Sequence, residues 1–211
     1  MHARAFTLAT MIAIASCSED AAGPADGGGG GGEVNVVTTH PDAEPIAPAT
    51  ECTVTTAEAR ETSGAHVEPC AEVSYETVPP CTGTHYSSWA DYGVYDAPVP
   101  WGFLVHCMEH GGVVLSYGCD AAECPDVVAA MEAIASEQTD SLCAGANPNR
   151  IVVAPDPTLP APVAAAAWGH VYRATCLDEP GLRAFVDAHY ADAPEDTCAG
   201  GVDLSATGWC P

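Results

Sequence analysis

The segment from residue 104 to 117 constrains the fold most, because a dense group of polar side chains is followed at once by two glycines and an apolar run. Its sequence is LVHCMEHGGVVLSY. In a strand, His106 and His110 would stand roughly 13 Å apart, whereas one helical turn brings their Cβ atoms to about 6 Å. Gly111 favours the left-handed conformation that ends a helix. We therefore predict a short helical turn over 106–110 and a strand over 113–117.

Four further elements are expected in order along the chain: a helix beginning at Pro125, a strand over 151–154, an extended run over 163–174 and a helix after Pro180. In the extended run, Trp168, His170 and Tyr172 fall on one face. This order predicts the α+β class. We expect a single small domain with a mixed or antiparallel sheet, covered by helices in a two-layer arrangement, and a loop-rich N-terminal part.

The N-terminus has the features of a processing signal over residues 1–16. Arg4 supplies a positive charge, a short apolar stretch follows, and the residues Ile-Ala-Ser-Cys ending at Cys17 match a bacterial lipobox. Cleavage before Cys17 and lipidation of its thiol would anchor the protein to the cell envelope without a membrane-spanning helix. An ordinary secretory signal that happens to contain a cysteine is the alternative.

Residues 17–50 then predict a lipidated Cys17 and a flexible tether, because glycine, alanine, proline and acidic residues dominate there and glycine occupies every position from 27 to 32. The remaining 51–211 is enough chain for one globular domain. We expect this domain to be exported, on the periplasmic or outer surface of a bacterial envelope.

The cysteines indicate several disulfides. The chain has 11 cysteines, and an even number remains once Cys17 is lipidated, as is typical of an oxidising compartment. Cys119 with Cys124, and Cys198 with Cys210, are close enough in sequence for local disulfides. Cys107 is interpreted first as a structural disulfide and second as a metal thiolate.

The charge excludes one class of partner. The net charge is −24, and the chain contains no lysine. Such a surface repels polyanions, so we expect no nucleic-acid partner. The membrane is the expected partner through the lipid, and the sequence names no protein or small-molecule partner.

A known family resembles this chain in three motifs: PPCTGTHY over 79–86, WADYGVY over 89–95 and VHCMEHGGVV over 105–114. The chain is similar, over roughly 75–190, to the bacterial exported and membrane-anchored proteins of domain-of-unknown-function family 3105. It departs from that family's pattern at 82–84, where Thr-Gly-Thr replaces Ser-Gly-Pro, at Met108, which replaces leucine, and in its extra cysteines. The resemblance implies one shared site containing His85, His106, Glu109 and His110, and no assigned activity.

These residues predict a transition-metal site. His85, His106 and His110 would hold one zinc or copper ion, with Met108 or Cys107 as a soft fourth ligand that would favour copper. The alternative for each histidine is a hydrogen-bonded core residue.

Two other functions remain open at this point. In a zinc-dependent hydrolase acting on cell-wall peptides, Glu109 would be the catalytic base for a metal-bound water; His85 with Asp91 resembles in part the zinc peptidases of peptidoglycan, although the spacing differs. In a structural or interaction lipoprotein there would be no metal.

Overall fold

The computed structural model describes residues 32–143, 147–204 and 210. The predicted signal, Cys17 and the first part of the tether lie outside this range. The helices are α1 (Trp101–Glu109), α2 (Pro125–Glu137) and α3 (Glu179–His189), and the strands are β1 (Glu33–Thr39), β2 (Val54–Ala59), β3 (His66–Val67), β4 (His85–Tyr86), β5 (Gly93–Val94), β6 (Val113–Tyr117), β7 (Ile151–Pro155), β8 (Val163–Ala167) and β9 (His170–Ala174).

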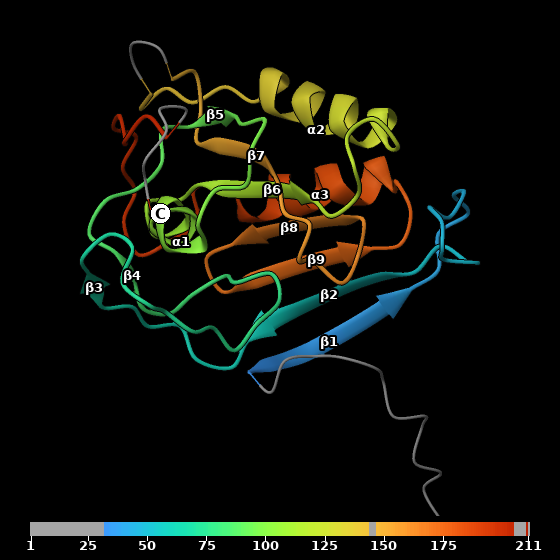
Figure 1. Ribbon diagram of the computed structural model, residues 1–211, viewed down its shortest axis with the longest axis horizontal. Coiled ribbons are helices and arrows are strands. Elements are labelled where there is room, and N and C mark those ends of the chain that lie inside the picture. The colour runs from blue at the N-terminus through green and yellow to red at the C-terminus, as the bar shows by residue number, and fades with distance from the viewer. Residues whose placement is uncertain (1–31, 144–146, 205–209, 211) are drawn as a thin grey trace, which may run out of the picture.

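Seven strands form one mixed sheet in the order β1-β2-β9-β8-β6-β7-β5 (Figure 1). Strand β6 lies inside the sheet, parallel to β7 and antiparallel to β8, so that Leu115 is opposite Val153 on one side and Ala165 on the other. Strands β3 and β4 form a separate parallel pair. The α+β class and the mixed sheet covered by helices are therefore confirmed.

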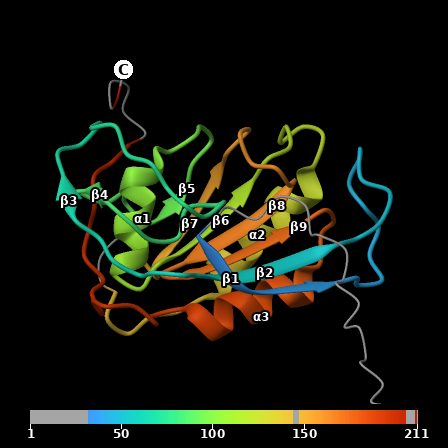
Figure 2. The same ribbon diagram turned by 90° about the horizontal axis from the view of Figure 1, so that it is seen from below.

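The sheet is covered on both faces, so the arrangement has three layers rather than the two predicted. Leu115 packs in a core with Met131 of α2 and Leu182 of α3. Its neighbour Val114 packs in a second core with Phe103 of α1. Figure 2 shows α1 and α3 on opposite sides of the sheet. The reason is that β6 is apolar at both odd and even positions, and successive side chains of a strand point to opposite faces.

The predicted helix end at the double glycine is confirmed. Gly111 has φ +86°, and the amides of Gly111 and Gly112 donate to the carbonyls of Met108 and Cys107 at 2.9 Å each. These two bonds form the Schellman motif, which needs a left-handed residue just after the helix. They fix the turn that joins α1 to the interior strand β6.

Two local predictions differ from the structure. Strand β1 lies inside the predicted tether; it is mostly exposed but pairs with β2, and its buried Glu33 forms an ion pair with Arg173. The extended run over 163–174 is a hairpin that turns at Trp168 and Gly169, where Gly169 has φ +79°. The turn reverses the chain, so Trp168 and Tyr172 lie in different cores.

Four disulfides are present among the described residues: Cys52–Cys176, Cys70–Cys210, Cys119–Cys124 and Cys143–Cys198. The predicted Cys119–Cys124 bond is confirmed, and the predicted Cys198–Cys210 bond is wrong, because each of its members pairs with a distant cysteine. Cys107 is a buried free thiol, like Cys81, so its interpretation as a disulfide is also wrong. Disulfides on this scale indicate an oxidising, extracytoplasmic compartment.

No helix in the described part of the chain combines the length and the apolar character that crossing a membrane requires.

Candidate functional site

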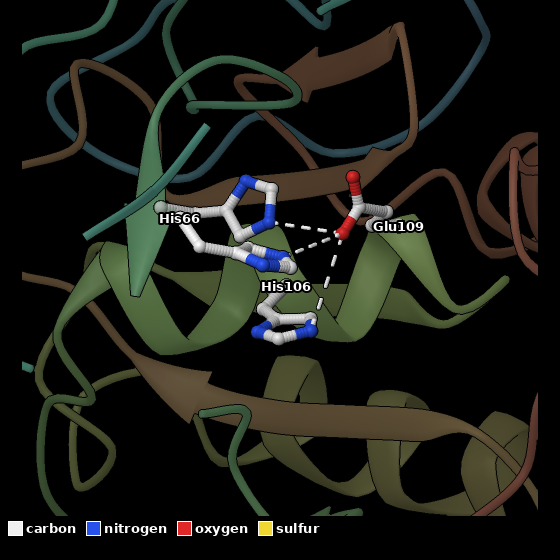
Figure 3. A group of neighbouring side chains, drawn as sticks. His66, His106 and Glu109 are labelled. Atoms are coloured by element: carbon white, nitrogen blue, oxygen red, sulfur yellow. Dashed lines mark hydrogen bonds and ion pairs between the residues drawn. The ribbon is translucent and has the colours of Figure 1, made fainter. Parts of the chain in front are cut away.

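Four side chains from three elements converge where α1 meets the β3–β4 pair. His106 and Glu109 lie on α1, His66 on β3 and His85 on β4, and one potential ligand atom from each lies within 4.8 Å of all the others. Figure 3 shows three imidazole rings around one carboxylate oxygen of Glu109. Residues three apart on a helix are neighbours on its surface, which explains why α1 supplies two of the four.

The carboxylate is the centre of the group. Glu109 Oε2 lies 3.0 Å from Nε2 of His85, 3.2 Å from Nε2 of His66 and 4.0 Å from Nε2 of His106. In a tetrahedral zinc site, with bonds of about 2.0–2.1 Å, neighbouring ligand atoms stand about 3.3 Å apart. The distances to His85 and His66 lie near that value and the distance to His106 is longer, and all four ligand atoms lie within 4.8 Å of one another.

Backbone carbonyls orient two of the imidazoles. Nδ1 of His85 donates to the carbonyl of Gly83 at 2.8 Å, and Nδ1 of His106 donates to the carbonyl of Tyr86 at 2.7 Å. A neutral imidazole whose hydrogen is on Nδ1 presents an unprotonated Nε2, and metal-bound histidines are held in this way. Gly83, with φ +117°, forms the turn that carries the first of these carbonyls.

Burial keeps His106 neutral. Its removal from water lowers the pKa of His106 to about 4, against the opposing hydrogen bond to Tyr86. Burial alone would raise the pKa of Glu109, but the charge of His85 and the hydrogen bonds from His66 and His85 outweigh it, so that pKa lies below its ordinary value. At neutral pH an ionised carboxylate therefore faces the Nε2 lone pair of His106. Two acceptors in this position attract a cation between them.

His110 lies outside this group. Its Nε2 is 3.1 Å from Oε2 of Glu195, and its ring packs edge-on against Trp89 with centroids 4.5 Å apart. Burial lowers the pKa of His110, opposed by the charge of Glu195. The amide of His110 donates to the carbonyl of His106 at 3.3 Å, and the two rings meet edge-on with centroids 4.6 Å apart, so the predicted proximity of these two histidines is confirmed. Nε2 of His110 nevertheless pairs with Glu195, and His110 is not among the residues whose ligand atoms converge.

The two sulfur side chains are also elsewhere. Cys107 and Met108 are fully buried in the apolar core between α1 and the sheet. The thiol of Cys107 donates to the carbonyl of Ala90 at 3.4 Å, and burial raises its pKa to about 12. They occupy the sheet-facing side of α1, whereas His106 and Glu109 face β3 and β4.

No sequence motif indicates His66 as a ligand. It follows a stretch rich in small and polar residues and belongs to no recognisable ligand motif. Only the parallel pairing of β3 with β4, which sets His66 opposite His85, brings it to the other three.

The fold and the group together define a disulfide-bonded α+β domain with a His3Glu cluster that could hold a metal ion. The chain belongs to the family described as "Protein of unknown function (DUF3105)", which matches residues 66–200. The match begins at His66 and includes all four residues of the cluster, and it confirms the resemblance seen in the three motifs. No curated protein and no solved structure matches the chain.

Proposed function

We propose that this protein is a lipid-tethered extracytoplasmic protein that binds one divalent transition-metal ion. The ligands are Nε2 of His66, His85 and His106 and a carboxylate oxygen of Glu109. The observation that carries the proposal is their convergence within 4.8 Å, with two of the imidazoles held by backbone carbonyls so that Nε2 points inward. Such support of the ligands is typical of metal sites.

Zinc is the ion that this ligand set fits best. Three imidazoles and one carboxylate suit zinc in a tetrahedral site. Three imidazoles suit copper as well, but the preference for copper over zinc depended on a soft sulfur ligand, and Met108 and Cys107 lie in the apolar core instead.

The location and partners follow from the sequence features at the N-terminus. The lipobox at Cys17 supports a lipid anchor, and the membrane is then the partner of the anchor. The net charge of −24 supports attraction of cations and argues against nucleic acid. Four disulfides agree with export.

The same residues argue against a hydrolase as the first choice. A catalytic zinc site keeps one position open for water, whereas here the carboxylate of Glu109 stands among the ligand atoms and is not left free as a base. A structural lipoprotein without metal would need no such convergence of three imidazoles on one carboxylate.

The test is metal content and affinity of the full-length protein, produced in an oxidising compartment without a His tag. We expect one zinc ion per molecule. Zinc at about 100 times its Kd should raise the free energy of unfolding by about 2.7 kcal/mol.

The matched variants are His85→Ala and His40→Ala. His85 is fully buried in the cluster, whereas His40 is exposed and lies 3.4 Å from the hydroxyl of Thr53. His85→Ala should lose the ion and His40→Ala should keep it. A wild-type protein that neither carries zinc nor gains stability from it would leave the histidines as core residues and refute the proposal.

A further inference from the structure

The four ligands differ greatly in exposure, and this difference bears on how an ion would enter. The side chains of His85 and His106 are 0% and 4% exposed, whereas that of His66 is 51% exposed. Both His66 and His85 lie on two-residue strands, but that of His85 is buried, whereas His66 is exposed and follows an exposed segment over 61–65. We infer that the ion exchanges with solvent beneath residues 61–69, which we call the strap, and that His66 is the ligand that leaves first. This inference rests on the proposed metal site.

The strap covers the buried ligand His85. Gly64 lies so close to it that a Cβ there would stand 2.6 Å from Cε1 of the His85 ring. No side chain separates the strap from the imidazole, so lifting the strap would expose that ring to water.

Few bonds hold the strap down. The amides of His85 and Ser87 donate to the carbonyls of Ala65 and Val67 at 3.0 and 2.8 Å. The hydroxyl of Thr82 donates to the carbonyl of Ser63 at 3.2 Å. Residues 61–66 are otherwise exposed, and segments with few buried contacts open most readily.

The two ends of the strap are fixed. Strand β2, which is paired on both sides, ends at Ala59 just before it, and the disulfide Cys70–Cys210 closes the other end. The middle can therefore lift while both ends stay attached. An ion bound by His66 and by the helix residues His106 and Glu109 would tie this middle to α1.

His66 and His106 differ in how their rings are oriented. Nδ1 of His106 is held by a carbonyl, so its ring is oriented whether or not an ion is bound. For Nδ1 of His66, no hydrogen bond is found within the part of the chain that the structure describes; its Nε2 contacts Glu109. Release of His66 thus breaks one bond to the ion while the ring of His106 keeps its orientation.

The first experiment measures release of zinc from the loaded full-length protein into an excess of a chromophoric chelator. His66→Ala should still bind one ion, because Glu109 and the two buried imidazoles held by backbone carbonyls remain. It should release the ion at least about tenfold faster, since loss of even an outer-shell partner typically lowers metal affinity 10- to 100-fold. His40→Ala, an exposed histidine away from the strap, should release at the wild-type rate.

The outcomes separate this inference from the metal site itself. Release from His66→Ala at the wild-type rate, or complete loss of binding in that variant, would overturn the exchange route while leaving the metal site in place. A wild-type protein without bound zinc would overturn both.

The second experiment measures amide hydrogen exchange by NMR, with and without zinc. The amides of His85 and Ser87, whose acceptors lie on the strap, should exchange at least several-fold more slowly in the zinc form. In His66→Ala the Ser87 amide should keep the metal-free rate even with zinc bound. The amide of Val113, bonded to Arg150 at 3.0 Å in the sheet, should not change. Equal exchange of Ser87 in the two wild-type forms would show that the strap does not move with the ion.

Discussion

Arg150 is a buried charge, and replacing it tests how the end of α1 is held. Its side chain is 2% exposed. It donates from Nε to Asp140 at 2.8 Å, and from Nη1 to Asp196 at 2.7 Å and to the carbonyl of His110 at 2.8 Å. The ring of Tyr190 lies 5.3 Å from its guanidinium carbon.

We predict that Arg150→Met lowers the free energy of unfolding by about 3–5 kcal/mol, because it leaves the carboxylate of Asp140 buried without its cation. Asp140 is itself only 6% exposed. With a urea m-value of about 2 kcal/mol/M, the midpoint should fall by about 2 M. Urea unfolding followed by circular dichroism, with the disulfides oxidised, measures it.

Arg183→Met is the matched control. Arg183 also pairs with two carboxylates, Glu137 at 2.6 Å and Glu179 at 2.9 Å, but at the surface. Ion pairs in water contribute little, so its midpoint should move far less. Equal shifts for the two variants would refute the argument from burial. The folded fraction of Arg150→Met should also bind zinc more weakly. Arg150 holds the carbonyl of His110 at the end of α1, and α1 carries His106 and Glu109.

Three further predictions concern acid stability, thiols and the anchor. Hydrogen bonds from Leu142, Tyr190 and Arg150 outweigh burial and lower the pKa of Asp140 in the folded protein. The ionised carboxylate therefore stabilises the fold above its ordinary pKa of about 3.9, and this stabilisation is lost as pH falls through the lower folded value. The urea midpoints of wild type and Asp140→Asn should accordingly converge as pH falls below about 4. Thiol counting in denaturant should find, apart from Cys17, two free thiols, Cys81 and Cys107, and finding six or more would disprove the disulfide framework. Cys17→Ala should move the protein from the membrane to the soluble fraction, and unchanged fractionation would rule out the lipid anchor.

Local sequence signals were sufficient for the elements around the centre of the sheet. The double glycine after Glu109 predicts the end of α1, because only glycine adopts φ +86° without strain. Pro125 predicts the start of α2, and the apolar run from Val113 predicts β6. Each depends on residues within one turn or strand, so the sequence determines them directly.

Long-range pairing was not readable in the same way. Cys198 bonds Cys143 and Cys210 bonds Cys70, across 55 and 140 residues, because the fold and not the spacing brings these thiols together. Strand β1 consists largely of exposed residues, and only the hydrogen-bonding edge of β2 gives it a partner.

In the candidate site, too, some neighbours follow from the sequence and others only from the packing. The sequence by itself determined that His106 and Glu109 share a helix face, since at 3.6 residues per turn positions three and four apart both lie within about 60° of each other. That same spacing could not choose between Glu109 and His110 as the partner of His106. The tertiary structure decided it: β3 and β4 bring His66 and His85 to one side of α1, whereas the C-terminal segment presents Glu195 to His110. Helical periodicity fixes which side chains are neighbours on one element, but a metal site needs ligands from several, and only packing determines which elements meet.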